Sequence, residues 1–119
     1  MRLSDLTIVL PTRDEASNIP RFLASVPADV HLVVVDDSED ETPTLIESLR
    51  PRRTRVIRQS STVTEARQLG VLVASTPWLL FTDADVSFAP DYFRSVTADR
   101  LSHAVYGPKL SRDAYAGYY

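Results

Sequence analysis

The chain has 119 residues and a net charge of −3, and its composition of 44% hydrophobic and 24% charged residues is that of a globular protein. Its length fits one domain with a real hydrophobic core, and its acidic balance argues against a general nucleic-acid binder. The absence of cysteine excludes disulfides and thiolate metal sites, and no apolar run approaches the ~20 residues of a membrane span.

Apolar and periodic segments alternate along the chain. In chain order they predict a strand over residues 6–11, a helix over 17–26, a strand over 30–37, a helix over 42–49, a strand over 54–59, a helix over 62–75, a strand over 77–83, a helix over 90–98 and a strand over 103–108. Ser17 or Asn18 can cap the first helix, and Thr42 is the predicted N-cap of the second. Thr62 and Glu65 have the spacing of a capping box in the third.

Strands that are apolar on both faces and alternate with helices predict an α/β fold: a mostly parallel sheet with helices on both faces. Right-handed crossovers then favour the strand order 3-2-1-4, within a single domain over residues 1–119. The chain reverses direction between strands 1 and 4, and ligands of such sheets bind at that switch point, beyond the carboxyl ends of the strands.

Acidic residues follow three of the predicted strands. They are Asp14 and Glu15, then Asp36 and Asp37, then Asp83 and Asp85. Each pair alone could cap the next helix, and we interpret residues 39–41 in that way. For Asp37, Asp83 and Asp85 the convergence on one sheet edge is informative, because carboxylates held close together repel unless a cation compensates them. Mg²⁺ typically takes one or two carboxylates plus phosphate oxygens, so Asp83 and Asp85 are candidate metal ligands.

The chain has three glycines, Gly70, Gly107 and Gly117, and none follows the first strand. This excludes a G-x-G-x-x-G dinucleotide loop and a Walker A loop. Phosphates would therefore be held by a metal and by arginine. Arg67, one turn into the third helix, is the natural candidate, although an exposed helical arginine explains it equally well. Gly70 lies in the middle of the same helix and predicts close packing of that helix on the sheet.

A run of arginines surrounds Pro51. Its members are Arg50, Arg52, Arg53, Arg55 and Arg58. A phosphate or lipid-headgroup patch is one interpretation. We favour a solvated turn after a helix, because five arginines spread over this short stretch cannot all face one way.

Four ordered segments resemble the nucleotide-binding half of family 2 glycosyltransferases, which have the GT-A fold. They are "TIVLPTRDEASNI", "VVVDDSEDET", "TEARQLG" and "LLFTDADV", followed by Pro90, and together they cover roughly residues 6–110. The resemblance implies transfer of a sugar from a UDP- or GDP-linked donor to an acceptor that the sequence does not identify. It further implies inversion at the anomeric carbon, with Mg²⁺ or Mn²⁺ as cofactor.

Carried over by position, the resemblance also implies site residues. Pro11, Thr12 and Glu15 would line the nucleoside pocket, and Asp37 would contact the base. Arg67 would lie near the diphosphate. Asp83 would face the ribose or the metal, Asp85 would bind the metal, and Ala84 between them would belong to the same nucleotide-sugar site. The metal would bridge the donor phosphates and neutralise charge on the leaving diphosphate.

The sequence departs from the family at two places. Arg13 and Asp14 stand where the family usually has an aromatic residue and asparagine. The segment "SSTVTEA" stands where the family usually has glycines, between strand 3 and the next helix.

The family also needs a second half that binds the acceptor and supplies a carboxylate base. Neither Asp99 nor Asp113 sits in a recognisable base motif. We therefore expect a chain truncated before that half, either a fragment or a natural short form, whose exposed edge would favour self-association.

The N-terminal stretch "MRLSDLTIVLPTRDE" lacks the pattern of a signal peptide, because a charged residue and a proline interrupt its apolar segment. We therefore expect a cytoplasmic location and leave peripheral association with the cytoplasmic membrane surface open.

Three other functions compete with a glycosyltransferase. A non-catalytic nucleotide-binding module would keep the same pocket, and the short length favours it. A nucleotidyltransferase would usually carry a glycine-rich basic loop after strand 1, which "PTRDEASN" lacks. A metal-dependent phosphatase or receiver-like domain shares the acidic cluster, but the last predicted strand offers no clear lysine partner apart from Lys109.

Overall fold

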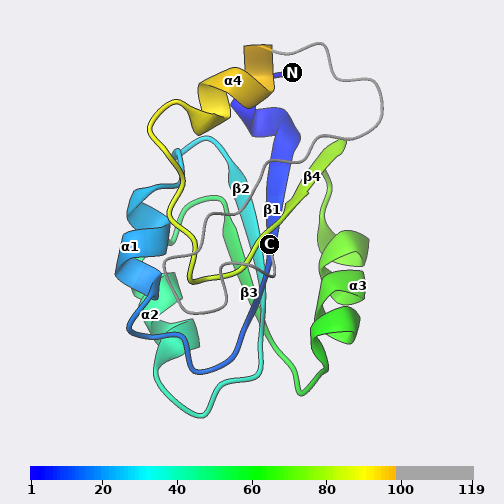
Figure 1. The fold of residues 1–119 in the computed structure, drawn as a ribbon. Helices are drawn as coiled ribbons and strands as arrows, with labels where there is room; N and C mark the ends of the chain where they lie inside the picture. The colour runs from blue at the N-terminus through cyan, green and yellow to red at the C-terminus, as the bar shows by residue number, and fades with distance from the viewer. Residues whose placement is uncertain (99–119) are drawn as a thin grey trace, which may run out of the picture.

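The centre of the molecule is a four-stranded parallel sheet, in a computed structural model that describes residues 1–98 (Figure 1). Its strands are β1 (Leu6–Thr12), β2 (His31–Asp36), β3 (Thr54–Arg58) and β4 (Trp78–Phe81). They lie in the order β3-β2-β1-β4, which confirms the predicted order. The strand expected over residues 103–108 lies outside the described part of the chain, as do Asp99, Lys109 and Asp113.

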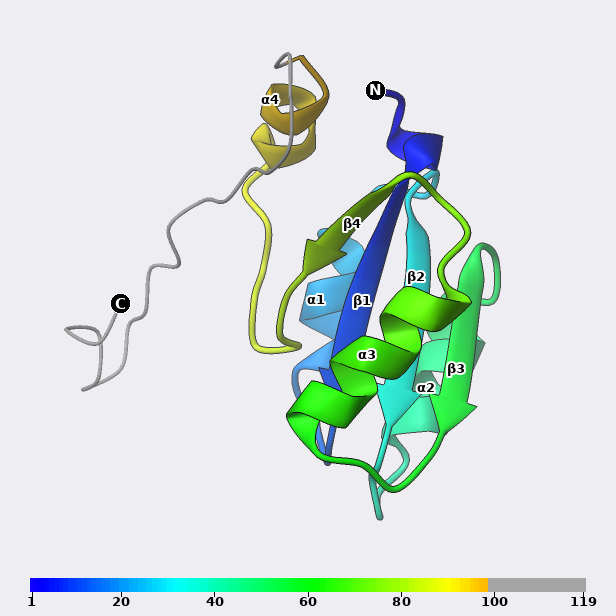
Figure 2. The same ribbon diagram turned by 90° about the vertical axis from the view of Figure 1, so that its right-hand side faces the viewer.

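Helices cover both faces of this sheet. They are α1 (Ile19–Ala24), α2 (Thr42–Leu49) and α3 (Val63–Val73). A further helix, α4 (Tyr92–Ala98), follows β4, and a short 3₁₀ helix, η1 (Leu3–Asp5), precedes β1. Figure 1 shows α1 and α2 on one side of the sheet and α3 on the other. Figure 2 shows α3 in front of the strands, and α4 beyond the amino end of β1. Among residues 1–98, no helix is long and apolar enough to cross a membrane.

The two central strands are buried on both faces, as their continuous apolar runs predict. Ile8 and Leu10 of β1 have no exposed surface and belong to the main core cluster, together with Phe22 of α1 and Ile46 of α2. Val9, which points the other way because side chains alternate along a strand, is also fully buried. Burial of these aliphatic side chains, each worth about 1.5–3 kcal/mol, is what fixes β1 at the centre of the sheet.

Helix α3 lies so close to β1 that only glycine fits at one position. A Cβ atom added to Gly70 would lie 2.3 Å from the Cγ1 atom of Val9. This confirms the close packing that a mid-helix glycine predicts. The same contact fixes the distance between α3 and the face of the sheet. Helix α3 begins beside the carboxyl ends of the strands.

The helix ends differ in part from the prediction. The capping box of α3 is present: Thr62 Oγ1 accepts from the backbone N–H of Glu65, and Glu65 accepts from that of Thr62. The prediction for α2 is wrong by one residue, because its N-cap is Glu41 and Thr42 is the first helical residue. The carboxylate of Asp40 accepts the N–H of Thr42 at 2.9 Å and thereby caps the amino end of the helix.

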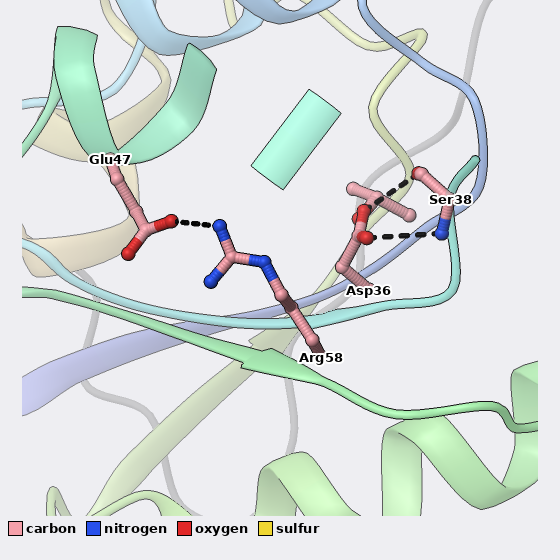
Figure 3. Close-up of polar contacts among 5 residues, drawn as sticks. Asp36, Ser38, Glu47 and Arg58 are labelled. Atoms are coloured by element: carbon pink, nitrogen blue, oxygen red, sulfur yellow. Dashed lines mark hydrogen bonds and ion pairs between the residues drawn. The ribbon is translucent and has the colours of Figure 1, made fainter. Parts of the chain in front are cut away.

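Two members of the arginine run serve the fold. Arg50 is only 9% exposed, and its guanidinium donates to the carbonyl oxygens of Pro27 and Val30 at 2.9 and 2.6 Å. Burial, followed by the charge of Arg53, lowers the pKa of Arg50. Arg58 instead forms an ion pair with Glu47 of α2, with Nη2 and Oε1 2.5 Å apart (Figure 3). The run therefore does not present one continuous cationic patch.

Candidate functional site

A cavity of about 360 Å³ lies at the carboxyl ends of β1, β2 and β4 and at the start of α3. Its walls are formed by Pro11, Thr12, Arg13, Glu15, Val35, Asp37, Ser61, Thr62, Val63, Ala66, Asp83, Ala84 and Asp85. This set contains every residue that the sequence predicted for the site except Arg67. Arg67 stands beside it, with Nη2 3.5 Å from Oδ1 of Asp83. The structure thus brings the predicted residues together, and their individual roles stay predictions.

The acidic pair after β2 divides into two functions. Asp36 is 2% exposed and accepts from Thr12 Oγ1 at 2.6 Å, from Ser38 Oγ at 2.7 Å and from Ser38 N at 3.0 Å (Figure 3). It therefore ties the ends of β1 and β2 together and does not line the cavity. Asp37 does line it, and its N–H donates to the carbonyl of Thr12 at 3.0 Å.

The pair after β1 divides in the same way. Glu15 lines the cavity, and its position is fixed by a bond from its N–H to Thr42 Oγ1 at 2.9 Å and by one from Asn18 Nδ2 to its carboxylate at 2.8 Å. Asp14 is not part of the cavity wall. Its Oδ1 accepts instead from the N–H groups of Glu39 and Asp40, at 2.8 and 3.2 Å.

The third acidic pair lies in a loop, because β4 ends at Phe81, earlier than the predicted strand over residues 77–83. Ala84 is 2% exposed and belongs to the core cluster. The buried methyl group anchors the loop, and Asp83 and Asp85 on either side of it both line the cavity. Further along, the ring of Phe88 packs 6.0 Å from that of Phe22 on α1 and so holds the rest of the loop against the core.

The ion pair between Arg67 and Asp83 is open to solvent. Their side chains are 44% and 50% exposed, and the contact is long at 3.5 Å. Exposed pairs of this kind contribute at most about 1 kcal/mol, so Arg67 can exchange this partner for another anion at little cost.

Several residues of the cavity wall were not predicted from the sequence. They are Arg13, Val35, Ser61, Thr62, Val63 and Ala66. Most of these come from the turn after β3 and the first turns of α3, and the N–H of Ser61 lies 3.4 Å from Oδ2 of Asp37. Loops that follow neighbouring parallel strands share one edge of the sheet, so the position of Ser61 and Thr62 was a usable signal.

The carboxylates of the cavity fit a hard divalent cation that takes its remaining ligands from a bound substrate. Within residues 1–98, no three carboxylates or histidines meet as a closed metal cage. Asp83 and Asp85 nonetheless carry oxygen atoms of the kind that Mg²⁺ and Mn²⁺ prefer as ligands, and Mg²⁺ commonly takes its remaining ligands from substrate phosphates and water. The donor set therefore suits a metal that binds together with a phosphorylated compound.

Comparison with known proteins gives consistent results. The protein-family model described as glycosyl transferase family 2 matches residues 7–106. An uncharacterized glycosyltransferase of Mycobacterium tuberculosis is 36% identical over 83 residues, which is 69% of this chain and 37% of that protein. Validoxylamine A glucosyltransferase of Streptomyces hygroscopicus subsp. limoneus is 34% identical over 104 residues, covering 78% of this chain and 23% of its own length. Succinoglycan biosynthesis protein ExoO of Rhizobium meliloti is 32% identical over 100 residues, again 78% of this chain and 29% of its own.

The fold has a counterpart among solved structures. The crystal structure of TarS residues 1–349 from S. aureus superposes with a TM-score of 0.71 over 78% of this chain and 31% of that one, at 23% identity. At this identity the likeness supports the fold alone. In all these comparisons the matched part spans less than two fifths of the other protein.

Proposed function

The chain belongs to glycosyl transferase family 2, and from this premise we propose that its cavity binds a nucleotide diphosphate sugar as the donor of an inverting, metal-dependent sugar transfer. The observation that carries the proposal is the convergence of Asp37, Asp83 and Asp85 on one cavity at the carboxyl ends of the strands. Open parallel sheets bind their ligands at this place.

The charges around the cavity support the metal dependence. Among residues 1–98, four carboxylates line it, those of Glu15, Asp37, Asp83 and Asp85, against the single guanidinium of Arg13. A diphosphate would be repelled by such a wall unless a cation came with it. Asp83 and Asp85 would hold that cation. When bound, Mg²⁺ or Mn²⁺ would neutralise the charge that develops on the leaving diphosphate.

The nucleoside would occupy the part of the cavity between β1 and β2. There Asp37 would accept an N–H from the base, as both uracil and guanine can offer, so a UDP- or a GDP-linked donor is consistent with this residue. Pro11, Thr12 and Glu15 would form the surrounding wall.

Arg67 would serve the diphosphate. Its guanidinium is already within 3.5 Å of a residue on the cavity wall, and its exposed pair with Asp83 is cheap to break. A phosphate offers two oxygens in the geometry that the planar guanidinium matches, so we expect Arg67 to leave Asp83 when the donor arrives.

Sugar transfer itself needs more than donor binding. An acceptor hydroxyl must be deprotonated by a base within about 3 Å as it attacks the anomeric carbon. We propose that residues 1–98 supply the donor site, and that the base and the acceptor site lie outside these residues. A non-catalytic nucleotide-binding role is the alternative if no base and acceptor site work with this chain.

The donor site can be tested by calorimetric titration of UDP and of GDP, each with and without Mn²⁺. We expect binding that requires the metal and that weakens by at least about tenfold in Asp85→Ala, because removing even a partner that orients a metal ligand typically costs about that much. Asp29→Ala is the matched control, because Asp29 is equally acidic and exposed but lies before β2, at the opposite edge of the sheet. Binding that is indifferent to Mn²⁺, or no binding by the folded protein, would contradict the proposal.

A further inference from the structure

Asp14 adopts a backbone conformation that most residues avoid. Its φ angle is 52°, in the left-handed region, where a side chain other than that of glycine, asparagine or aspartate is strained. Such a conformation persists when the surroundings hold it in place. Asp14 is exposed and does not line the cavity, so neither burial nor the site itself provides that hold.

The hold comes from the loop that follows β2. Oδ1 of Asp14 accepts the backbone N–H groups of Glu39 and Asp40, at 2.8 and 3.2 Å. In the opposite direction, the N–H of Asp14 donates to Ser38 Oγ at 2.8 Å, and that hydroxyl donates onward to the buried carboxylate of Asp36 at 2.7 Å. Asp14 therefore joins the β1–α1 loop to the β2–α2 loop through both its backbone and its side chain.

The residues on either side of Asp14 are the ones that reach the cavity. Arg13 and Glu15 both line it, although the residue between them does not. The left-handed conformation of Asp14 belongs to a bend at residues 13 and 14, and this bend sets where the side chains of Arg13 and Glu15 start. Any shift of the loop would move the only cation on the cavity wall among residues 1–98, together with one of its carboxylates.

We propose that Asp14 is a positioning residue, whose carboxylate clamps the β1–α1 loop to the β2–α2 loop and thereby presents Arg13 and Glu15 to the ligand. That the ligand is a nucleotide diphosphate sugar rests on the proposed function; that Asp14 fixes the wall rests on the hydrogen bonds alone. Hydrogen bonds to an ionised acceptor are stronger than neutral ones, but water competes at an exposed site. The effect is therefore on the position of the loop more than on the stability of the fold.

Three substitutions separate the hydrogen bonds from the backbone strain. Asp14→Asn keeps an acceptor oxygen and tolerates the left-handed conformation, Asp14→Gly keeps the conformation without the acceptor, and Asp14→Ala loses both. We expect Asp14→Asn to bind UDP or GDP with Mn²⁺ within about twofold of wild type, because its side-chain oxygen can still accept the N–H groups of Glu39 and Asp40. Asp14→Gly and Asp14→Ala should both bind roughly tenfold more weakly, the scale found when an orienting partner is removed. The urea unfolding midpoint of Asp14→Gly should stay close to that of wild type, whereas that of Asp14→Ala should fall, because alanine is strained at this φ angle.

Amide hydrogen exchange gives a second readout that needs no ligand. In wild type and Asp14→Asn the N–H groups of Glu39 and Asp40 should be protected, and in Asp14→Gly and Asp14→Ala they should exchange faster and the amide signals of Arg13 and Glu15 should shift. If wild type binds no nucleotide, the proposed function fails, and the exchange result still decides the clamp. If the amides of Glu39 and Asp40 stayed protected in Asp14→Gly, the proposed clamp would be wrong. It would also be wrong if these amides lost their protection while nucleotide binding did not change. Binding by Asp14→Gly at wild-type strength would likewise show that the carboxylate positions nothing.

Discussion

Gly70 of α3 packs against Val9 of β1, and the space between them leaves no room for a Cβ atom at Gly70. We predict that Gly70→Ala destabilises the protein. The alanine would gain about 1 kcal/mol of helix propensity, but overpacking a buried site costs about 1–3 kcal/mol. With the added Cβ atom 2.3 Å from Val9 Cγ1, the cost should lie near the upper limit, for a net loss on the order of 1–2 kcal/mol in the free energy of unfolding.

Urea denaturation of single and double variants would measure this effect. In Val9→Ala/Gly70→Ala the clash is relieved, so the second substitution should cost less than it does in wild type. Thr64→Ala, at an exposed position of the same helix, controls for propensity and should stabilise by a few tenths of a kcal/mol. A Gly70→Ala protein as stable as wild type would mean that α3 moves away from the sheet freely.

Single residues also mark the limit of what the sequence could reveal. Gly70 was predictable because a mid-helix glycine is costly and needs a reason. The division of labour between Asp36 and Asp37 was not, because neighbouring acidic residues look alike in a sequence. Only the alternation of side chains at the end of β2 sends one carboxylate inward to Thr12 and Ser38 and leaves the other on the cavity wall.

At the scale of elements, the start of α3 carries a titratable cap. Hydrogen bonds with Thr62, first from its backbone N–H and then involving its side chain, lower the pKa of Glu65 from its ordinary value of 4.5. A group whose pKa is lower in the folded state stabilises the protein above its unfolded pKa and loses that contribution as the pH falls through its folded pKa. We therefore predict that the free-energy difference between wild type and Glu65→Gln shrinks as the pH falls below about 4.5.

Denaturation at a series of pH values would test this prediction. Asp40 also has a lowered pKa, chiefly through its bond from the Thr42 side chain, but that contribution is the same in both proteins and cancels in the difference. Thr62→Ala removes the other half of the box and should cost about 1 kcal/mol near neutral pH. A difference between wild type and Glu65→Gln that does not vary with pH would show that the carboxylate of Glu65 does not cap the helix in solution.

The elements differ in how well their ends could be predicted. The capping box of α3 is a reciprocal pattern with fixed spacing, so its start was identified correctly. The start of α2 was placed one residue late, because Asp40, Glu41 and Thr42 are all chemically capable of capping. Which of these residues becomes the cap depends on the loop after β1, because the N–H of Glu15 in that loop donates to the hydroxyl of Thr42.

For the whole molecule, the strand order was the most predictable feature, because doubly buried strands, alternating helices and right-handed crossovers leave few arrangements. The same order places the ends of β1, β2 and β4 around one cavity. The cavity was therefore predictable in location. Its wall from the β3–α3 turn was predictable only from the position of that turn after a neighbouring parallel strand, because no charged residue marks it.

Because the cavity joins three strands of one continuous sheet, ligand binding should stabilise the fold as a unit. A ligand that binds only the folded state, at one hundred times its dissociation constant, adds about 2.7 kcal/mol to the free energy of unfolding. In a domain of this size we expect a rise in Tm on the order of 10 °C when UDP or GDP is added with Mn²⁺. Scanning calorimetry should show a single transition that moves as a whole, whereas Mn²⁺ alone should move it little. Asp85→Ala should lose at least about half of the shift, because a tenfold weaker affinity leaves about 1.4 kcal/mol of the stabilisation. A nucleotide that broadens or splits the transition would instead mean that the loop carrying Asp83 and Asp85 unfolds independently of the sheet, and that the donor holds only part of the molecule together.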